Sequence, residues 1–178
     1  MTYLDQTTLL LTLFDDHCIE SVDLTALDQP DTYAGQCGSD GEHYMGHRLT
    51  NLRMKNPTGI QAVSSSHVYF ASHAHNAIYD IDTATDTVIT LTSGVPKPQM
   101  MTYLPSLDVL IVARKDPLVM VSLTRGTMSG LSGHPLSDSE LVSANRAGFT
   151  TLIDVAVVST DAIVVSDHDN HRSVQTWK

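Results

Sequence analysis

The tetrapeptide Met-Thr-Tyr-Leu occurs twice in this chain, at residues 1–4 and at residues 101–104. Each copy is followed by the same order of apolar runs and turn residues, closed by a glycine. A third copy of the pattern spans residues 56–94, and a fourth, which stops early, spans residues 149–178. A repeat of this period is typical of solenoids, propellers and other arrays.

The apolar runs within each copy are short and rich in Val, Ile, Leu, Thr and Tyr. Several alternate apolar with polar residues, as at residues 78–82 and 87–91, which predicts β-strands. Strands separated by Asp, Asn, His, Gly and Pro turns favour an all-β propeller of four-stranded blades in one domain, residues 1–178. The last of its four blades is expected to lack the outermost strand. The expected blades are about residues 1–37, 56–94, 99–133 and 149–178, with inserts at residues 38–55 and 134–148.

Two of the copies resemble the NHL repeat. In the second copy, Asn-Pro-Thr-Gly-Ile at residues 56–60 precedes an apolar strand and the turn at residues 76–78. In the fourth copy, Asp-His-Asp-Asn-His-Arg at residues 167–172 is similar to the most typical stretch of the family. The third copy departs from the pattern, with Ala-Arg-Lys-Asp-Pro-Leu at residues 113–118. The resemblance covers most of the chain and implies a β-propeller, but no single activity.

The composition predicts a globular core and an acidic surface. Of 178 residues, 42% are hydrophobic and 17% are charged, and the formal net charge is −10. A nucleic-acid partner would require clustered Lys and Arg to bind the phosphates. One of the densest basic groups, Arg48, Arg53 and Lys55, has only three residues. We therefore expect no nucleic-acid binding, and an RNA-binding NHL domain is the second alternative function.

Neither a membrane span nor a signal peptide is predicted. The longest apolar runs, residues 9–14 and 155–158, are far shorter than the ~20 residues of a membrane helix. The N-terminus carries Asp5 and has no basic region. Because the pattern begins and ends within a repeat, the sequence is expected to be either a segment of a longer protein or an incomplete gene model, which leaves the compartment open.

The two cysteines predict a disulfide in the first blade. Cys18 opens the third expected strand and Cys37 follows the fourth. A hairpin turning near residues 26–28 places opposite each other residues whose numbers sum to about 55, as these two do. Opposed Cβ atoms lie ~4.5–5.5 Å apart, near enough for a bridge. A loop of about 20 residues gives ~3 kcal/mol of stabilisation in the chain-entropy model, and the alternative is two buried thiols.

The residues around these cysteines also indicate where the protein is located. Asp16-His17-Cys18 and Gly35-Gln36-Cys37 resemble NHL-like repeats of invertebrate secreted and cell-surface proteins. The resemblance implies an extracellular or cell-surface protein in an oxidising environment. No Asn-x-Ser/Thr sequon supports this location, because Pro57 interrupts the candidate.

The two inserts are the predicted binding surface. Both join the outer strand of one blade to the inner strand of the next, so both are expected to project on the same side, outside the repeated core. Insertions on one face of a repeat protein often form its binding surface. The candidate partner-binding residues of the first insert are His43, Tyr44, His47 and Arg48.

Several histidines fall in the loops between second and third strands. They are His17, His73, His75, His168 and His171. A ring of imidazoles is able to hold a divalent metal, which gives the main alternative function, a metal-dependent propeller lyase or hydrolase. A turn role is favoured, because these loops lie away from a propeller axis and short polar side chains complete turn hydrogen bonds. Asp167 and Asp169 are too few for a Ca²⁺ site. No catalytic residue, metal or cofactor is predicted.

The resemblance and the composition together favour a non-catalytic extracellular interaction or scaffolding module within a larger adhesive or filament-forming assembly. The final strand, residues 172–177, has no expected neighbour on one side. An open strand edge templates pairing with another strand. Val174, Thr176 and Trp177 are therefore the candidate assembly edge. A protein partner, or self-association into an oligomer, is expected there.

Overall fold

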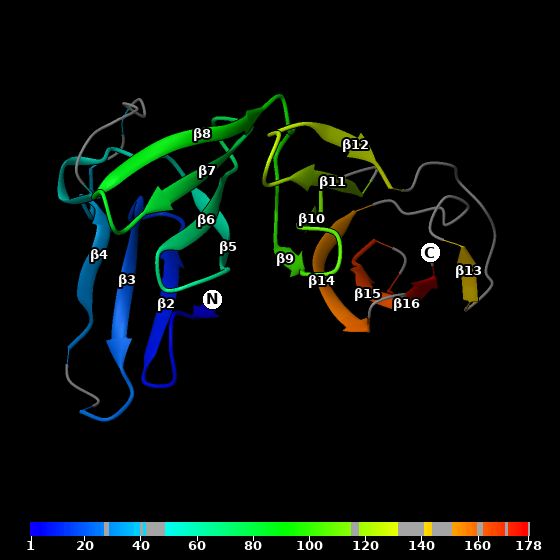
Figure 1. The fold of residues 1–178 in the computed structure, drawn as a ribbon, viewed down its shortest axis with the longest axis horizontal. Helices are drawn as coiled ribbons and strands as arrows, with labels where there is room; N and C mark the ends of the chain where they lie inside the picture. Colours follow the sequence, from blue (N-terminus) through cyan, green and yellow to red (C-terminus); the bar gives the residue numbers. More distant parts are fainter. Residues whose placement is uncertain are drawn as a thin grey trace. The chain divides into compact units, whose positions relative to one another are not determined.

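The computed structural model describes most of the chain as strands connected by tight turns (Figure 1). The described residues are 1–26, 29–39, 41, 49–114, 118–131, 141–143, 151–159, 162–169 and 171–177, with backbone alone at 50, 141–143, 172 and 174–177. Within them, helical structure is confined to the 3-10 helix η1 (Leu49–Asn51). That part of the chain contains no helix of the length and apolarity needed to cross a membrane.

The described strands form four sheets of four strands each. The first sheet has the order β1 (Thr2–Tyr3), β2 (Thr8–Leu13), β3 (Cys18–Asp23), β4 (Asp31–Gly35). The second has the order β5 (Pro57–Ala62), β6 (His67–Ser72), β7 (Ala77–Asp82), β8 (Thr87–Ser93). The third has the order β12 (Met128–Gly130), β11 (Val119–Ser122), β10 (Val109–Val112), β9 (Met101–Leu104). The fourth has the order β13 (Leu141–Ser143), β16 (Arg172–Trp177), β15 (Ala162–Asp167), β14 (Leu152–Ser159).

The all-β prediction is confirmed, and the expected composition of the last sheet is wrong. Three sheets are antiparallel and follow the chain from strand to neighbouring strand. In the fourth, β13 comes from the second expected insert and pairs in parallel with β16, with Leu141 opposite Gln175 and Ser143 opposite Trp177. The fourth sheet is therefore completed by an earlier segment of the chain itself.

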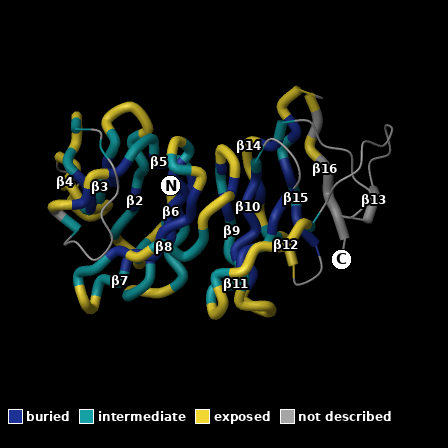
Figure 2. Tube along the Cα trace, turned by 90° about the horizontal axis from the view of Figure 1, so that it is seen from above, coloured by how far each residue is buried: buried dark blue, intermediate teal, exposed yellow. Residues whose placement is uncertain are grey.

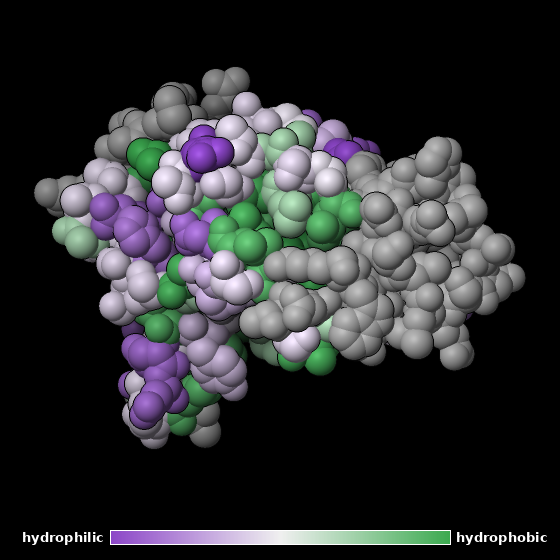
Figure 3. All heavy atoms as spheres, turned by 45° about the vertical axis from the view of Figure 1, so that its right-hand side comes forward, coloured by the Kyte–Doolittle hydropathy of each residue, from purple (hydrophilic) through white to green (hydrophobic). Residues whose placement is uncertain are grey.

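Short polar side chains shape the turns of the first sheet. Asp5 Oδ1 accepts hydrogen bonds from the backbone N–H groups of Thr7 and Thr8, both at 2.8 Å. Asp23 Oδ1 accepts from the hydroxyl and the backbone N–H of Thr25, both at 2.7 Å. These bonds favour the ionised carboxylates, so the pKa of Asp5 and the pKa of Asp23 lie below their usual value. Figure 3 shows hydrophilic side chains gathered at lower left, where these turns lie.

The chain divides into two compact units, residues 1–97 and 98–178, each of which holds two sheets. In the first unit, Leu10 and Ile19 of the first sheet share a core with Phe70 of the second sheet. All three side chains are fully buried, and Figure 2 shows the buried stretch of β6 in dark blue. The expectation that residues 1–178 form one domain stays a prediction.

Part of the first insert belongs to this core. Leu52 and Met54 are fully buried in it, and Leu49 packs against it. The expectation that the whole insert projects outside the repeated core is therefore wrong for these residues. Their apolar side chains are therefore part of the core that the first two sheets share.

The second unit has an equivalent core. Leu104 and Ile111 of the third sheet lie with Leu152 and Val165 of the fourth, and all four are at most 3% exposed. Backbone contact supports the packing, since Met100 N–H donates to the carbonyl oxygen of Ile153 at 3.3 Å. Each unit is thus a pair of sheets that bury one face against each other.

Truncation of Phe70 tests the core of the first unit. Phe70→Ala is expected to lower the free energy of unfolding by about 3–5 kcal/mol, because the ring is fully buried and lies 5.0 Å from the ring of Tyr79. The measurement is urea unfolding followed by circular dichroism. Ile89→Ala is the matched control, since Ile89 is 52% exposed and its truncation should cost less than ~0.5 kcal/mol. Equal effects of the two substitutions would contradict the shared core.

Candidate functional site

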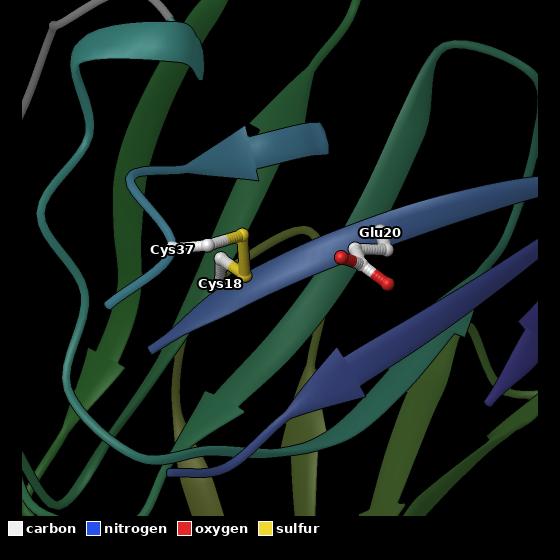
Figure 4. Close-up of side chains that lie close together, drawn as sticks. All are labelled: Cys18, Glu20 and Cys37. Atoms are coloured by element: carbon white, nitrogen blue, oxygen red, sulfur yellow. A yellow bond between two sulfur atoms is a disulfide. The ribbon is translucent and has the colours of Figure 1, made fainter. Parts of the chain in front are cut away.

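A disulfide joins Cys18 to Cys37 at the end of the first sheet (Figure 4). The two Cα atoms lie 5.0 Å apart, and 19 residues separate the cysteines in sequence. Cys18, the first residue of β3, is fully buried, whereas Cys37, beyond the end of β4, is exposed. The predicted bridge is confirmed. It ties the segment that follows the edge strand β4 to the interior of the sheet.

The geometry of the bridge differs from the expected direct opposition of the cysteines. In the ladder between β3 and β4, Cys18 lies opposite Gly35. The backbone of Gly35 has a φ of 90°, and the N–H of Gly38 donates to the carbonyl oxygen of Asp16 at 2.8 Å, so the chain turns and brings Cys37 to Cys18. A Cβ atom at Gly35 would lie 3.2 Å from the Cα of Cys18, and positive φ disfavours any side chain there.

Glu20 lies beside the bridge, two residues after Cys18 on the same strand (Figure 4). Its carboxylate and the two sulfur atoms lie within 4.8 Å of one another. Among the described residues, no other group of three or more His, Cys, Asp and Glu side chains has this spacing. Because the sulfur atoms are bonded to each other, the group presents one carboxylate to solvent in the oxidised protein.

The predicted histidine loops have a common backbone conformation. The residue directly before the third strand has positive φ in three sheets, with 59° at His17, 54° at Asn76 and 51° at His171. Asn, Asp and His are the side chains that tolerate this left-handed region best after glycine. The conformation closes the turn and starts the strand, which supports the turn role for these residues.

The same turns hold neighbouring segments of the first unit. The Nδ1 atom of His17 accepts a hydrogen bond from the N–H of Asn56 at 3.2 Å, directly before β5. The N–H of His73 donates to the carbonyl oxygen of Asn56 at 3.0 Å. The Oδ1 atom of Asn76 accepts from the N–H of Lys97 at 2.8 Å, beyond the end of β8. The loops of the first and second sheets therefore fasten the segments that connect successive sheets.

A cavity of about 370 Å³ opens beside the equivalent turn of the fourth sheet. It is lined by Ile153, Ser166, Asp167, His168, His171 and Ser173. The carboxylate of Asp167 accepts from the N–H of Thr151 at 3.4 Å, and the Thr151 hydroxyl donates to the Oδ2 atom of Asp169. The Nδ1 atom of His168 lies 2.9 Å from the Oδ1 atom of Asp169. Both carboxylates are thus engaged with residues of the turn, as a structural role requires.

Sequence reasoning missed a polar pair in the second sheet. The Nδ1 atom of His67 lies 3.1 Å from the Oδ1 atom of Asp80, which is 8% exposed. Burial raises the pKa of Asp80, and the contact with His67 opposes this change. The alternation of apolar and polar residues at 79–82 contained the available signal, because it places Asp80 on the face opposite Tyr79 and Ile81.

The candidate partner-binding residues, His43, Tyr44, His47 and Arg48, lie outside the described residues. Their role stays a prediction. The buried positions of Leu49 and Leu52 place the end of this insert against the core of the first unit. Residues 42–48 are therefore the part of the insert for which a binding role is still proposed below.

The candidate assembly edge is not open along the whole of β16. Thr176 and Trp177 lie opposite Val142 and Ser143 of β13, so the expectation of an unpaired edge at these two residues is wrong. Val174 pairs with Val165 on the other side. The edge of the described sheet is β13 rather than β16.

Comparison with known proteins gives a similarity of fold. No protein-family model and no curated protein sequence matches the chain. The crystal structure of the computationally designed Ika4 protein is similar, with a TM-score of 0.56 and 10% sequence identity over 99% of this chain and 88% of that chain. At this identity the similarity concerns the fold alone.

Removal of the bridge tests its contribution to stability. The double variant Cys18→Ala and Cys37→Ala is expected to lose about 3 kcal/mol of unfolding free energy, because its unfolded chain is no longer closed into a loop. Urea unfolding with and without a reductant measures this loss, and reduced wild-type protein is the control that should match the variant. Two alkylatable thiols in native, unreduced protein would contradict the bridge.

Acidification tests whether burial of the His73 imidazole makes the stability of the protein depend on pH. The imidazole ring packs 5.8 Å from Phe14, and its Nε2 atom is buried without a partner among the described residues. Burial, and then the charge of Lys97, lowers the pKa of His73 below 6.5. The unfolded chain therefore takes up this proton first, and the folded state loses stability as the pH falls below about 6.5.

The expected result is a smaller loss of stability on acidification in His73→Phe than in the wild type. Phenylalanine keeps the contact with Phe14 and cannot be protonated. Urea unfolding at about pH 7.5 and about pH 5.5 gives the two free energies. His168→Phe is the control, because the His168 side chain is 68% exposed. A pH dependence that is the same in His73→Phe and wild type would contradict the argument.

Proposed function

We propose that this chain is a non-catalytic extracellular interaction or scaffolding module with the architecture of an NHL-like β-propeller. The observation that carries the proposal is the disulfide between Cys18 and Cys37. Structural disulfides persist in secreted and cell-surface proteins and are rare in reducing compartments. In a secreted or cell-surface protein, a bridge at one edge of a four-stranded sheet would persist and stabilise that sheet.

The repeated sheets support the propeller part of the proposal. A blade is a four-stranded antiparallel sheet whose strands follow one another in the chain. The first three sheets have this order, and the fourth reaches four strands by adding β13. The turn residues His17, Asn76 and His171 recur at one position of the repeat, in agreement with the resemblance to NHL sequences.

The proposed partner is a protein that contacts the insert at His43, Tyr44, His47 and Arg48, or a further copy of this chain. Aromatic and Arg side chains are enriched in protein interfaces. The net charge of −10 favours a protein over a nucleic acid, because phosphates are repelled by an acidic surface. A module of this kind would act within a larger adhesive or filament-forming assembly.

The alternative is a metal-dependent lyase or hydrolase. Its support would be a set of imidazole or carboxylate ligands with an open coordination position. In the described residues the group with ligand spacing is Cys18, Glu20 and Cys37, with both sulfurs in a disulfide. Because a disulfide sulfur is a poor metal ligand, these three residues support the enzyme alternative less than the disulfide supports the scaffolding proposal.

The test compares wild-type protein with a variant in which His43, Tyr44, His47 and Arg48 are all replaced by alanine. Both are secreted from cultured cells and cross-linked to extracellular-matrix proteins, and the expected result is a specific cross-linked protein that the variant loses at least about tenfold. Ile89→Ala, at an exposed site of the second sheet, is the control that should keep the cross-link.

Thiol mapping and metal analysis of the same preparation complete the test. A bridged protein with substoichiometric metal is the expected result. Two free thiols in protein isolated from its natural source, or a stoichiometric divalent metal with hydrolytic or lyase activity, would overturn the proposed function.

A further inference from the structure

Three side chains with metal-ligating atoms converge at one end of the first sheet (Figure 4). Cys18 and Glu20 lie two residues apart on β3, so both side chains are on the same face of that strand. Cys37 joins them from the turn that follows β4. The two sulfur atoms and a carboxylate oxygen of Glu20 lie within 4.8 Å of one another, close enough to surround a single ion. All three residues belong to the first unit.

The ladder between β3 and β4 adds a hydroxyl group to this cluster. The register shifts between Ile19 and Glu20, so Tyr33 is the extra residue of a β-bulge and Thr32 lies opposite Glu20. The Oγ1 atom of Thr32 is 3.7 Å from the Sγ atom of Cys37, which is hydrogen-bond distance for sulfur. A hydroxyl donor beside a cysteine sulfur is the kind of outer contact that supports a metal ligand.

The carboxylate of Glu20 is available to a cation. Glu20 is half-buried, and its carboxylate has no hydrogen bond or salt bridge to any residue in the part of the chain that the structure describes. In contrast, the carboxylates of Asp5 and Asp23 accept hydrogen bonds within their turns. A carboxylate that loses hydration without gaining a partner costs free energy, and a bound cation would supply the partner.

Backbone hydrogen bonds hold the two cysteines near each other independently of the S–S bond. Cys18 lies in the ladder opposite Gly35, and the N–H of Gly38 donates to the carbonyl oxygen of Asp16 at 2.8 Å. The Cα atoms of Cys18 and Cys37 are 5.0 Å apart. The fold therefore keeps the two sulfurs and the carboxylate together when the bridge is reduced.

We propose that the reduced protein binds one Zn²⁺ ion through Cys18, Glu20 and Cys37. A phosphine reductant gives two electrons to the S–S bond, each sulfur takes up a proton from water, and the phosphine keeps the oxygen as its oxide. Zn²⁺ then binds both sulfurs as thiolates, together with the carboxylate, and the two thiol protons are released. A water molecule would complete the tetrahedral coordination.

The ligand set determines which metal fits. Thiolates favour Zn²⁺ over Ca²⁺ and Mg²⁺, which prefer oxygen ligands. With Zn–S distances of ~2.3 Å, the sulfurs of a tetrahedral site lie ~3.8 Å apart. Because Cys37 is exposed, rotation of its side chain gives this separation without movement of the fully buried Cys18. The ion would also compensate the charge of the Cys18 thiolate, which burial otherwise disfavours. Zinc would thus replace the disulfide as the link between β3 and the segment after β4.

Metal titration of the reduced chain tests this proposal. After reduction with a phosphine under argon, wild-type protein is expected to bind one equivalent of Zn²⁺, measured by competition with a chromophoric chelator, whereas oxidised protein binds none at this site. With Co²⁺ in place of Zn²⁺, a thiolate-to-cobalt charge-transfer band should appear. Histidine ligation elsewhere in the chain would not give this band.

Substitution of single ligands provides the comparison. Glu20→Gln and Cys37→Ser are each expected to weaken zinc binding by the reduced protein at least about tenfold. Asp31→Asn is the matched control with unchanged affinity, because Asp31 pairs with Ser21 and lies on the opposite face of the same two strands. Circular dichroism of the reduced, zinc-loaded protein should retain the spectrum of the oxidised protein.

The inference fails if reduced wild-type protein binds no zinc, if Cys37→Ser binds it as tightly as wild type, or if the reduced, zinc-loaded protein loses its sheet spectrum. It goes beyond the proposed function, which concerns the oxidised protein, so none of these results alters the cross-linking experiment. Zinc-bound free thiols in protein isolated from its natural source would instead support this site and contradict the extracellular proposal.

Discussion

Face-to-face packing of apolar sheets is the constraint on which this structure depends. The described residues contain no long helix to cover a sheet, so each sheet must bury its faces on another sheet or on a segment of the chain. Phe70, Leu10 and Ile19 satisfy this requirement in the first unit, and Leu52 and Met54 of the first insert fill the remaining space. Apolar residues in a connecting segment are thus part of the core rather than additions to it.

The turns make this packing repeatable. A residue with positive φ before the third strand fixes where that strand begins, and therefore which residues of the second strand face each side. Asn76 also receives a hydrogen bond from the N–H of Lys97, so the turn that sets the register also restrains the segment that leaves the sheet. Local turn chemistry and sheet packing therefore reinforce each other.

The sequence predicted the strands of the first three sheets in groups of four, three strands of the fourth sheet, and the disulfide partners, because alternation and turn residues are local signals. It did not predict that Leu141–Ser143 completes the fourth sheet, since a parallel pairing between distant segments leaves no periodic signature. The burial of Leu52 was also missed, because nothing in the insert distinguishes an apolar residue that fills a core from one on its surface. The contact between His67 and Asp80 depends on a diagonal geometry across two strands, which composition does not reveal.

The unequal burial of the two cysteines determines which sulfur an external thiol can attack. The sulfur of Cys18 sits in the interior of the sheet, and that of Cys37 belongs to an exposed residue. An incoming thiolate attacks a disulfide at the sulfur it can reach, and the other sulfur leaves. Exchange with an external thiol would therefore form the mixed disulfide on Cys37 and release Cys18 as the thiol held within the protein.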